Sequence, residues 1–231
     1  MDDIYVLILF LMLYFSPVFY QLIIVIKESK RGNRLPLKRF LKILKISLFI
    51  LIPIAVVFGV LSHTNFLDYE KPIPYERHEE ITFENFRGLE FFKRSLYGNE
   101  RFAYVITTFE SKIEDDGVTV EAFFHPSRSF VYNKKANSPD LLTHEIYHFK
   151  ITEAFVRKTK WQIDQTGSDD RAAIKRIISL NRSDCQKYQN AYDYDSFHSY
   201  VLSEQKRYEK EVDSLLALWE DYKSPKVYFN E

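Results

Sequence analysis

Two histidines and a glutamate near the middle of the sequence have the spacing of a zinc site. Residues 144–148 read His-Glu-Ile-Tyr-His, an HExxH motif. On an α-helix, residues four positions apart face the same side, so His144 and His148 can share one zinc ion. Glu145 then lies beside that ion, where it can accept a proton from a bound water molecule. The motif therefore predicts a Zn²⁺ cofactor and hydrolysis with Glu145 as the general base.

A zinc site that catalyses hydrolysis needs a third protein ligand, because such sites keep three ligands and one water molecule. Glu153 is excluded because it follows His144 by nine residues, a rotation of about 180° on a helix, and faces away. The best distant donors lie in residues 192–199, which read Tyr-Asp-Tyr-Asp-Ser-Phe-His-Ser. We predict His198 as the third ligand, with Glu204 as its main rival.

The other polar residues of this segment have predicted supporting roles. Asp193 or Asp195 could orient an imidazole through a hydrogen bond. The hydroxyl of Tyr192 or Tyr194 could stabilise a tetrahedral oxyanion. The alternative is that the segment only caps a helix and that its histidine lies on the surface.

The elements that must position these residues form a domain of strands followed by helices. The sequence predicts strands at residues 81–88, 102–113, 118–124 and 129–132, with a hairpin turn at 114–117. It predicts helices at residues 138–161, 169–180 and 196–222. The first helix has strong start signals, because Ser138 can cap it and Pro139 suits its first turn. This order of elements predicts an α+β domain.

Two long stretches without charged residues precede this domain. Residues 4–26 form one of them and residues 46–62 the other, and the second extends back to residue 41 if its lysines reach the interface. Both are long enough to predict transmembrane helices. The alternatives are buried helices of a soluble protein or, for the first stretch, a cleaved signal peptide. Asp2 and Asp3 stand where a signal peptide has basic residues.

Charge predicts the orientation of these two spans. Between residues 27 and 39, six Lys or Arg residues are opposed by Glu28 alone, so the loop is expected to be cytoplasmic. We predict a multi-pass protein of the bacterial inner membrane with an extracytoplasmic C-terminal domain. Its parts are a membrane anchor (1–62) with a basic loop (27–42), a linker (63–80) and the α+β domain (81–231).

The composition of the remaining chain limits its partners and its chemistry. Residues 63–231 contain 24 basic and 29 acidic residues, a balance of −5 that argues against nucleic acid as a partner. Cys185 is the single cysteine, which excludes an intramolecular disulfide and a thiolate metal cluster.

Further motifs accompany HExxH. Residues 144–153 read HExxHF-x-I-x-E, residues 82–88 contain Phe83, Asn85 and Gly88, and residues 192–199 contain Tyr-Asp-x-x-Ser-x-His-Ser. On these motifs, most of residues 81–212 resembles a bacterial family described as predicted secreted zinc-dependent proteases, otherwise a domain of unknown function. That family has tryptophan, aspartate, threonine and glycine where this chain has Phe83, Asn85, Ser196 and Ser199. The resemblance implies a zinc peptidase and supports His198 as a functional residue.

Together these observations predict an α+β zincin-like metallopeptidase domain preceded by two transmembrane helices. Its expected partners are the lipid bilayer and a protein or peptide substrate outside the cytoplasmic membrane. We also predict that the strand at residues 118–124 pairs with an extended substrate. The alternative is a non-catalytic interaction or sensor module of the cell envelope, in which a fourth protein ligand makes zinc a structural clamp.

Overall fold

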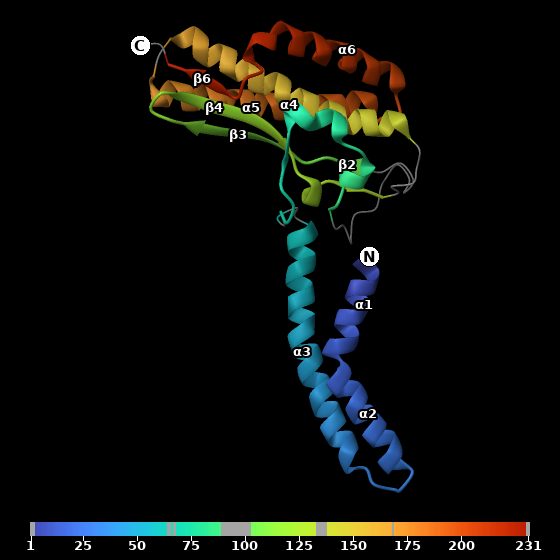
Figure 1. Ribbon diagram of the computed structural model, residues 1–231. Helices are drawn as coiled ribbons and strands as arrows, with labels where there is room; N and C mark the ends of the chain where they lie inside the picture. Colours follow the sequence, from blue (N-terminus) through green and yellow to red (C-terminus); the bar gives the residue numbers. More distant parts are fainter. Residues whose placement is uncertain are drawn as a thin grey trace. The chain divides into compact units, whose positions relative to one another are not determined.

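The computed structural model describes residues 3–63, 66, 68–88, 103–132, 138–167 and 169–229 (Figure 1). The chain divides into two compact units, Met1–Leu61 and Ser62–Glu231. The N-terminal unit is built from helices α1 to α3, and the described strands and helices α4 to α6 belong to the C-terminal unit.

The N-terminal unit is a pair of helical arms joined by a short turn. Its helices are α1 (Asp3–Tyr14), α2 (Ser16–Ser29) and α3 (Leu35–His63). The chain bends by 57° between α1 and α2. Pro17 lies in the first turn of α2, next to this break, whereas Pro53 lies within α3 and leaves it continuous. The hydroxyl of Tyr14 donates to the carbonyl of Ser47 (2.7 Å) and so links the arms.

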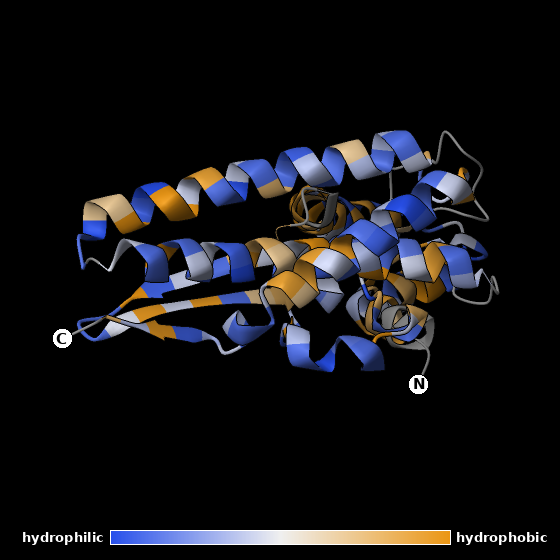
Figure 2. Ribbon diagram, turned by 90° about the horizontal axis from the view of Figure 1, so that it is seen from above, coloured by the Kyte–Doolittle hydropathy of each residue, from blue (hydrophilic) through white to orange (hydrophobic). Residues whose placement is uncertain are grey.

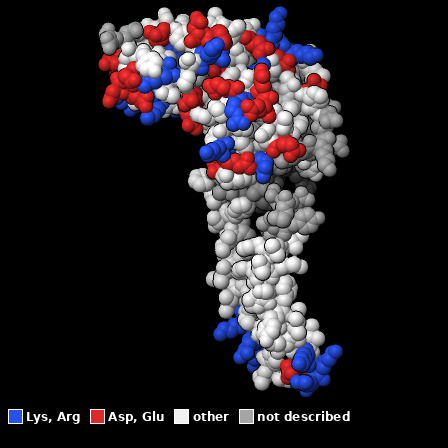
Figure 3. Space-filling view, in the orientation of Figure 1, with Lys and Arg blue, Asp and Glu red and all other residues white. Residues whose placement is uncertain are grey.

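The surface of these helices is apolar. Large side chains such as Leu13 (66 % exposed) and Phe49 (81 %) point outward, and the helices appear mainly orange in Figure 2. Residues Leu35–Leu61 of α3 are long and apolar enough to cross a membrane, and α1 with α2 qualifies only as a bent pair. Most of the predicted basic loop is helical, and only residues 30–34 form the turn, at the end marked by blue side chains in Figure 3.

The C-terminal unit consists of an antiparallel sheet, the helix α4 packed on the sheet, and two further helices packed on α4. The described strands are β1 (Ile73–Pro74), β2 (Ala103–Tyr104), β3 (Thr107–Ile113), β4 (Gly117–Phe124), β5 (Phe130–Val131) and β6 (Lys226–Tyr228). The described helices are α4 (Pro139–Thr166), α5 (Arg171–Ser196) and α6 (Leu202–Leu218), with 3₁₀ turns at Tyr75–Glu80, Phe83–Asn85, Pro126–Arg128 and Glu220–Tyr222. The described strands form two antiparallel sheets, one of β1, β3, β4 and β6 and one of β2 and β5. Helices packed on one side of the larger sheet make this an α+β domain. Its zincin-like class stays a prediction.

Strand β4 is the centre of the sheet. It pairs along its whole length with β3, from Thr107 opposite Phe124 to Ile113 opposite Val118, as the predicted hairpin requires. Its other edge pairs with β1 and β6. Both edges of β4 are therefore occupied, and the prediction that it pairs with a substrate is wrong. The outer edge of β3 has no strand partner among the described residues.

The core lies between β4 and α4. Alternate side chains of β4 face inward, and Val120 and Phe124 are fully buried against Phe149 and Val156 of α4. Burying one such side chain contributes about 1.5–3 kcal/mol. The opposite side of α4 packs against α5 and α6, where Tyr192 is among the buried residues. Helix α4 is thus covered by the sheet on one side and by α5 and α6 on the other. Its polar residues, such as His144 and Glu145, are therefore also buried.

The start of α4 is confirmed, and its end is later than predicted. The hydroxyl of Ser138 accepts a hydrogen bond from the backbone N–H of Leu141 (3.4 Å), with Pro139 in the first turn. The helix continues beyond Trp161 to Thr166. It ends at Gly167, whose left-handed φ of 55° suits glycine.

The boundaries of the next two helices were predicted wrongly. Residues 181–195, expected to be largely non-helical, belong to α5, and residue 196 ends this helix instead of starting the next. The buried residues Ile174, Ile178, Cys185 and Tyr192 form one stripe of α5 with helical spacing. The many polar residues between them conceal this period in the sequence.

Two segments near the domain's start also differ from prediction. Residues 81–88 contain a 3₁₀ turn, Phe83–Asn85, in place of a strand, and Asn85 and Thr82 cap each other at its start. The C-terminal part of the predicted linker, residues 73–80, belongs to the domain. There β1 pairs with β4, and Tyr75 packs against the core.

Candidate metal centre

Three donor atoms from two helices meet in the C-terminal unit. His144 and His148 lie one turn apart on α4, and Asp193 lies in the last turn of α5. The Nε2 atoms of the two histidines are 3.3 Å apart. Oδ1 of Asp193 lies 2.9 Å from Nε2 of His148 and 3.1 Å from Nε2 of His144. These three residues form a group that could hold a metal ion.

The spacing of these donors fits zinc. A tetrahedral zinc ion with ligands at about 2.0–2.1 Å has ligand atoms separated by about 3.3–3.4 Å. The three observed separations, 2.9–3.3 Å, come close to this value before any adjustment to an ion. Two imidazoles and one carboxylate are also a donor set found in catalytic zinc sites. The residues present therefore fit the predicted cofactor.

The protonation of two of the three donors suits metal binding, whereas the hydrogen bond with Asp193 raises the pKa of His148 despite its burial. His144 is fully buried and stacks on Tyr192 with ring centroids 4.5 Å apart. Burial lowers the pKa of His144 to about 4, which keeps its imidazole neutral. Although burial opposes the shift, hydrogen bonds with three imidazoles lower the pKa of Asp193 and keep it anionic. A neutral imidazole and a carboxylate are the forms that bind metals.

Gln189 fixes the orientation of His148 and was missed in the sequence. Its Oε1 lies 3.1 Å from Nδ1 of His148, and its Nε2 donates to the hydroxyl of Thr152 (3.1 Å). With the proton on Nδ1, the lone pair of Nε2 points toward the other donors. Gln189 precedes Asp193 by four residues on α5, so the two side chains share one face of this helix. A sequence prediction that extended the helix to residue 196 would have found this relation.

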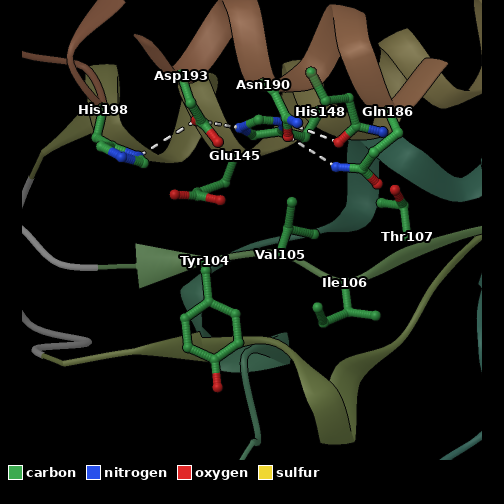
Figure 4. A pocket seen from close by; sticks show the side chains of 11 residues that line it. Tyr104, Val105, Ile106, Thr107, Glu145, His148, Gln186, Asn190, Asp193 and His198 are labelled. Atoms are coloured by element: carbon green, nitrogen blue, oxygen red, sulfur yellow. Dashed lines mark hydrogen bonds and ion pairs between the residues drawn. The ribbon is translucent and has the colours of Figure 1, made fainter. Parts of the chain in front are cut away.

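Glu145 lies in a pocket beside the donors. The pocket has a volume of about 220 Å³, and His148, Asp193 and His198 also line it. In Figure 4 the Glu145 carboxylate lies below these residues and faces Tyr104 to Thr107 across the cavity. Burial raises the pKa of Glu145 to about 7, opposed in part by a hydrogen bond with the Val105 backbone. A carboxyl with this pKa can both accept and release a proton near neutral pH.

His198 lies at the edge of the donor group. Its Nδ1 is 3.3 Å from Oδ1 of Asp193, and its side chain is 42 % exposed. It is outside the group of mutually close donors. The structure thus gives Asp193, which we expected to orient an imidazole, the position next to both motif histidines. His198, the predicted third ligand, contacts Asp193 from the pocket side.

The backbone around His198 is unusual. Phe197, His198 and Ser199 all have left-handed φ angles, 49°, 50° and 69°. This conformation costs about 1–2 kcal/mol for each residue that is not glycine. Backbone hydrogen bonds hold it, including Val201 N–H to the Ser196 carbonyl (2.8 Å). Strain of this kind is concentrated at functional sites.

Three of the residues predicted to support or rival the site lie elsewhere. Asp195 accepts a hydrogen bond from Tyr208 (2.7 Å), because it lies on another side of α5 from Asp193. Tyr194 is 84 % exposed. Glu204 pairs with Arg207 on α6. Tyr192 is at the site, but it packs on His144 through its ring, and its hydroxyl has no hydrogen-bond partner among the described residues.

Of the other histidines, His125 has a clear structural role. Its Nδ1 lies 2.8 Å from Oδ2 of Asp68, and its Nε2 lies 2.8 Å from the hydroxyl of Thr108. It therefore joins the start of the C-terminal unit to the sheet. His78 contacts the carbonyl of Tyr75 within its 3₁₀ turn, and the side chain of His63 is outside the described residues.

Comparisons with protein-family models, with curated proteins and with solved structures found no match to this chain. The similarity to secreted zinc-dependent proteases therefore stays a prediction that depends on the sequence motifs.

Proposed function

We propose that this chain is a membrane-anchored zinc metallopeptidase that hydrolyses peptide bonds outside the cytoplasmic membrane. One observation supports this function above all others. Two residues of a donor set suited to zinc, His148 and Asp193, line the same pocket as the buried carboxyl of Glu145, whose pKa is about 7. A purely structural metal site needs no such base beside its ligands.

The residues of the pocket have separate roles in this proposal. His144, His148 and Asp193 would hold zinc, which would supply a bound water molecule of lowered pKa and polarise the carbonyl of the substrate. Glu145 accepts the proton of the attacking water and returns it to the leaving amine. Nδ1 of His198 faces the pocket end of Asp193 and keeps this carboxylate oriented.

The substrate is proposed to bind as an extended peptide along β3. Tyr104 to Thr107 line the pocket opposite Glu145, and β3 continues from Thr107 with its outer edge unpaired by any described strand. Backbone N–H and C=O groups of such an edge can pair with a peptide. Strand β3 is thus proposed to pair with the substrate in place of β4, whose edges are both occupied.

The anchor is proposed to cross the membrane twice, with the turn at residues 30–34 in the cytoplasm. The exposed apolar surface of α3 and the bent pair α1 and α2 support the two spans. The cluster of basic side chains at the turn supports the orientation.

Replacing Glu145 with glutamine tests the proposed reaction. The change keeps the size of the side chain but removes the proton acceptor, so we expect hydrolysis to fall by about 10²–10⁴-fold. Zinc bound per chain should stay unchanged, because Glu145 is outside the donor set. The measurement uses the full chain in detergent, a fluorescent denatured protein as substrate, and metal analysis.

Glu204→Gln serves as the matched control, because this glutamate pairs with Arg207 away from the pocket. It should retain both zinc and activity. Undiminished hydrolysis by the Glu145→Gln chain would exclude this mechanism.

A zinc-stabilised interaction module is the second candidate. It is favoured by the position of His198, which could supply a fourth ligand after a small movement toward the donors. In that case the metal would have no site for water. Zinc bound tightly by the wild-type chain without any hydrolysis would favour this function.

A further inference from the structure

A groove continues from the metal centre along α5 and the outer edge of β3. The central pocket shares Thr107, Gln186 and Gln189 with a second hollow, which also contains Phe109 and Arg182. This second hollow shares Arg182 with a third one, lined by Ser111 and Lys175 among others. The three hollows are therefore neighbours, and they follow the strand that we propose as the substrate's partner.

The charges of this groove are divided between its ends. Glu145 and Asp193 are at the metal centre. The described lining of the second and third hollows contains no acidic residue, but it contains Arg171, Lys175 and Arg182. Residues 63–231 carry 24 basic and 29 acidic residues, so a cationic groove end is contrary to the domain's overall charge.

Arg182 is held in place between the helix and the strand. Its Nη2 donates to the hydroxyl of Ser111 on β3 (2.9 Å), and its guanidinium lies over the ring of Phe109 (5.3 Å). Neither contact neutralises its charge, and no described acidic residue forms an ion pair with Arg182 or Lys175. Arg171, in contrast, pairs with Asp115 (2.7 Å). Two cations thus remain available to an anionic ligand.

We propose that Arg182 and Lys175 form a subsite for a carboxylate of the bound peptide. The inference deepens the proposed function, because it specifies a substrate with an acidic group at a set distance from the metal. On α5, Asp193 is eleven residues from Arg182 and eighteen from Lys175, or about 16 and 27 Å along the helix. An extended peptide covers these distances with about five and about eight residues, so the carboxylate is expected five to eight residues from the metal. The carboxylate belongs either to an Asp or Glu side chain or to the peptide's C-terminus.

Binding of short peptides tests this subsite without requiring hydrolysis. The protein is the full-length Glu145→Gln chain in detergent, loaded with zinc. The probes are fluorescent twelve-residue peptides of Ala, Ser and Val. One is neutral with a C-terminal amide, two carry a single Glu near either end, and one has a free C-terminal carboxylate.

We expect at least one acidic probe to bind about five- to tenfold more tightly than the neutral probe, with the difference reduced at high salt. Preference for a Glu probe identifies a side-chain carboxylate, and preference for the free acid identifies the C-terminus. Adding Lys175→Gln or Arg182→Gln should remove most of the difference. The side chain of Lys175 is exposed and makes no hydrogen bond or ion pair to other described residues, so its replacement should leave the fold intact.

Arg176→Gln is the control, because this exposed neighbour on α5 is absent from the described groove lining. It should retain the preference. Equal binding of all probes, no binding of any probe, or the same loss with Arg176→Gln would overturn the subsite. The proposed peptidase activity is judged separately, by hydrolysis with the wild-type chain, so either idea can fail without the other.

Discussion

Asp193 connects most of the polar groups of the metal centre. Its Oδ1 lies 2.9–3.3 Å from a nitrogen of His144, His148 and His198. One oxygen cannot be both a metal ligand and the hydrogen-bond acceptor of the same two Nε2 atoms. An ion between these atoms would replace the hydrogen bonds by coordination, with little change in the positions of the side chains. This makes Asp193 the best candidate for the third ligand.

Removing either side chain separates the two assignments of the third ligand. Asp193→Ala should lose stoichiometric zinc, because it removes a donor within reach of both histidines. His198→Ala should retain zinc, with affinity lowered about 10–100-fold at most through the loss of an outer contact. Metal analysis and competition with a chelator measure both. Zinc lost from the His198 variant and kept by the Asp193 variant would assign the ligand to His198 instead.

At the scale of elements, the segment between α5 and α6 determines the position of His198 beside the donor group. Helix α5 delivers Gln189 and Asp193 to α4, and the three left-handed residues that follow turn His198 toward Asp193. Ser199 has the largest of the three φ angles, 69°, and is 3 % exposed. The family that the sequence resembles has glycine at this place, where a left-handed backbone carries no steric penalty.

Replacing Ser199 with glycine should stabilise the C-terminal unit. Relief of the left-handed strain, about 1–2 kcal/mol, exceeds the entropy that glycine adds to the unfolded chain, about 0.5–1 kcal/mol. We expect the free energy of unfolding to rise by about 0.5–1 kcal/mol. Both tryptophans, Trp161 and Trp219, are in this unit, so their fluorescence in urea reports its unfolding.

Ser199→Ala is the matched control, because it removes the hydroxyl and keeps the strained backbone. It should bring no gain in stability. An equal gain from alanine would mean that the hydroxyl, rather than the backbone, is unfavourable at this buried position.

At the scale of the whole molecule, the chain consists of an apolar unit, Met1–Leu61, and an acidic unit, Ser62–Glu231. The N-terminal unit exposes many apolar side chains, whose contact with water is unfavourable, whereas the C-terminal unit has its own core. This division is the basis for proposing that the first unit is a membrane anchor. The orientation follows only from the basic residues near the turn.

Cysteine labelling tests this orientation. The natural Cys185 is buried at 4 % exposure, so it should react little. Leu218→Cys, at an exposed position of α6 (69 %), should react with an impermeant maleimide on intact spheroplasts. Leu35→Cys, next to the turn (74 % exposed), should react only after lysis. The opposite pattern would place the C-terminal unit in the cytoplasm.

The sequence alone determined those features that depend on near neighbours in the chain. The spacing of His144 and His148 fixes them on one side of a helix, and Ser138 and Pro139 fix where that helix begins. The hairpin of β3 and β4 follows from alternation and a polar turn. The apolar helices of the first unit follow from length and composition, because no partner is needed to recognise them.

Only the tertiary structure decided which distant groups complete the site. Asp193 and His198 are five residues apart, and both are chemically able to bind zinc. The choice between them depends on where α5 ends and how the chain turns there. The long polar surface of α5 conceals its helical period in the sequence, and its true end appears only when the stripe from Ile174 to Tyr192 packs against α4. The tertiary structure likewise decided that β1 and β6, from opposite ends of the unit, cover β4, whereas the outer edge of β3 has no strand partner in the described part of the chain. Contacts between residues so far apart leave no periodic signal in the chain, because they arise from packing and not from local spacing.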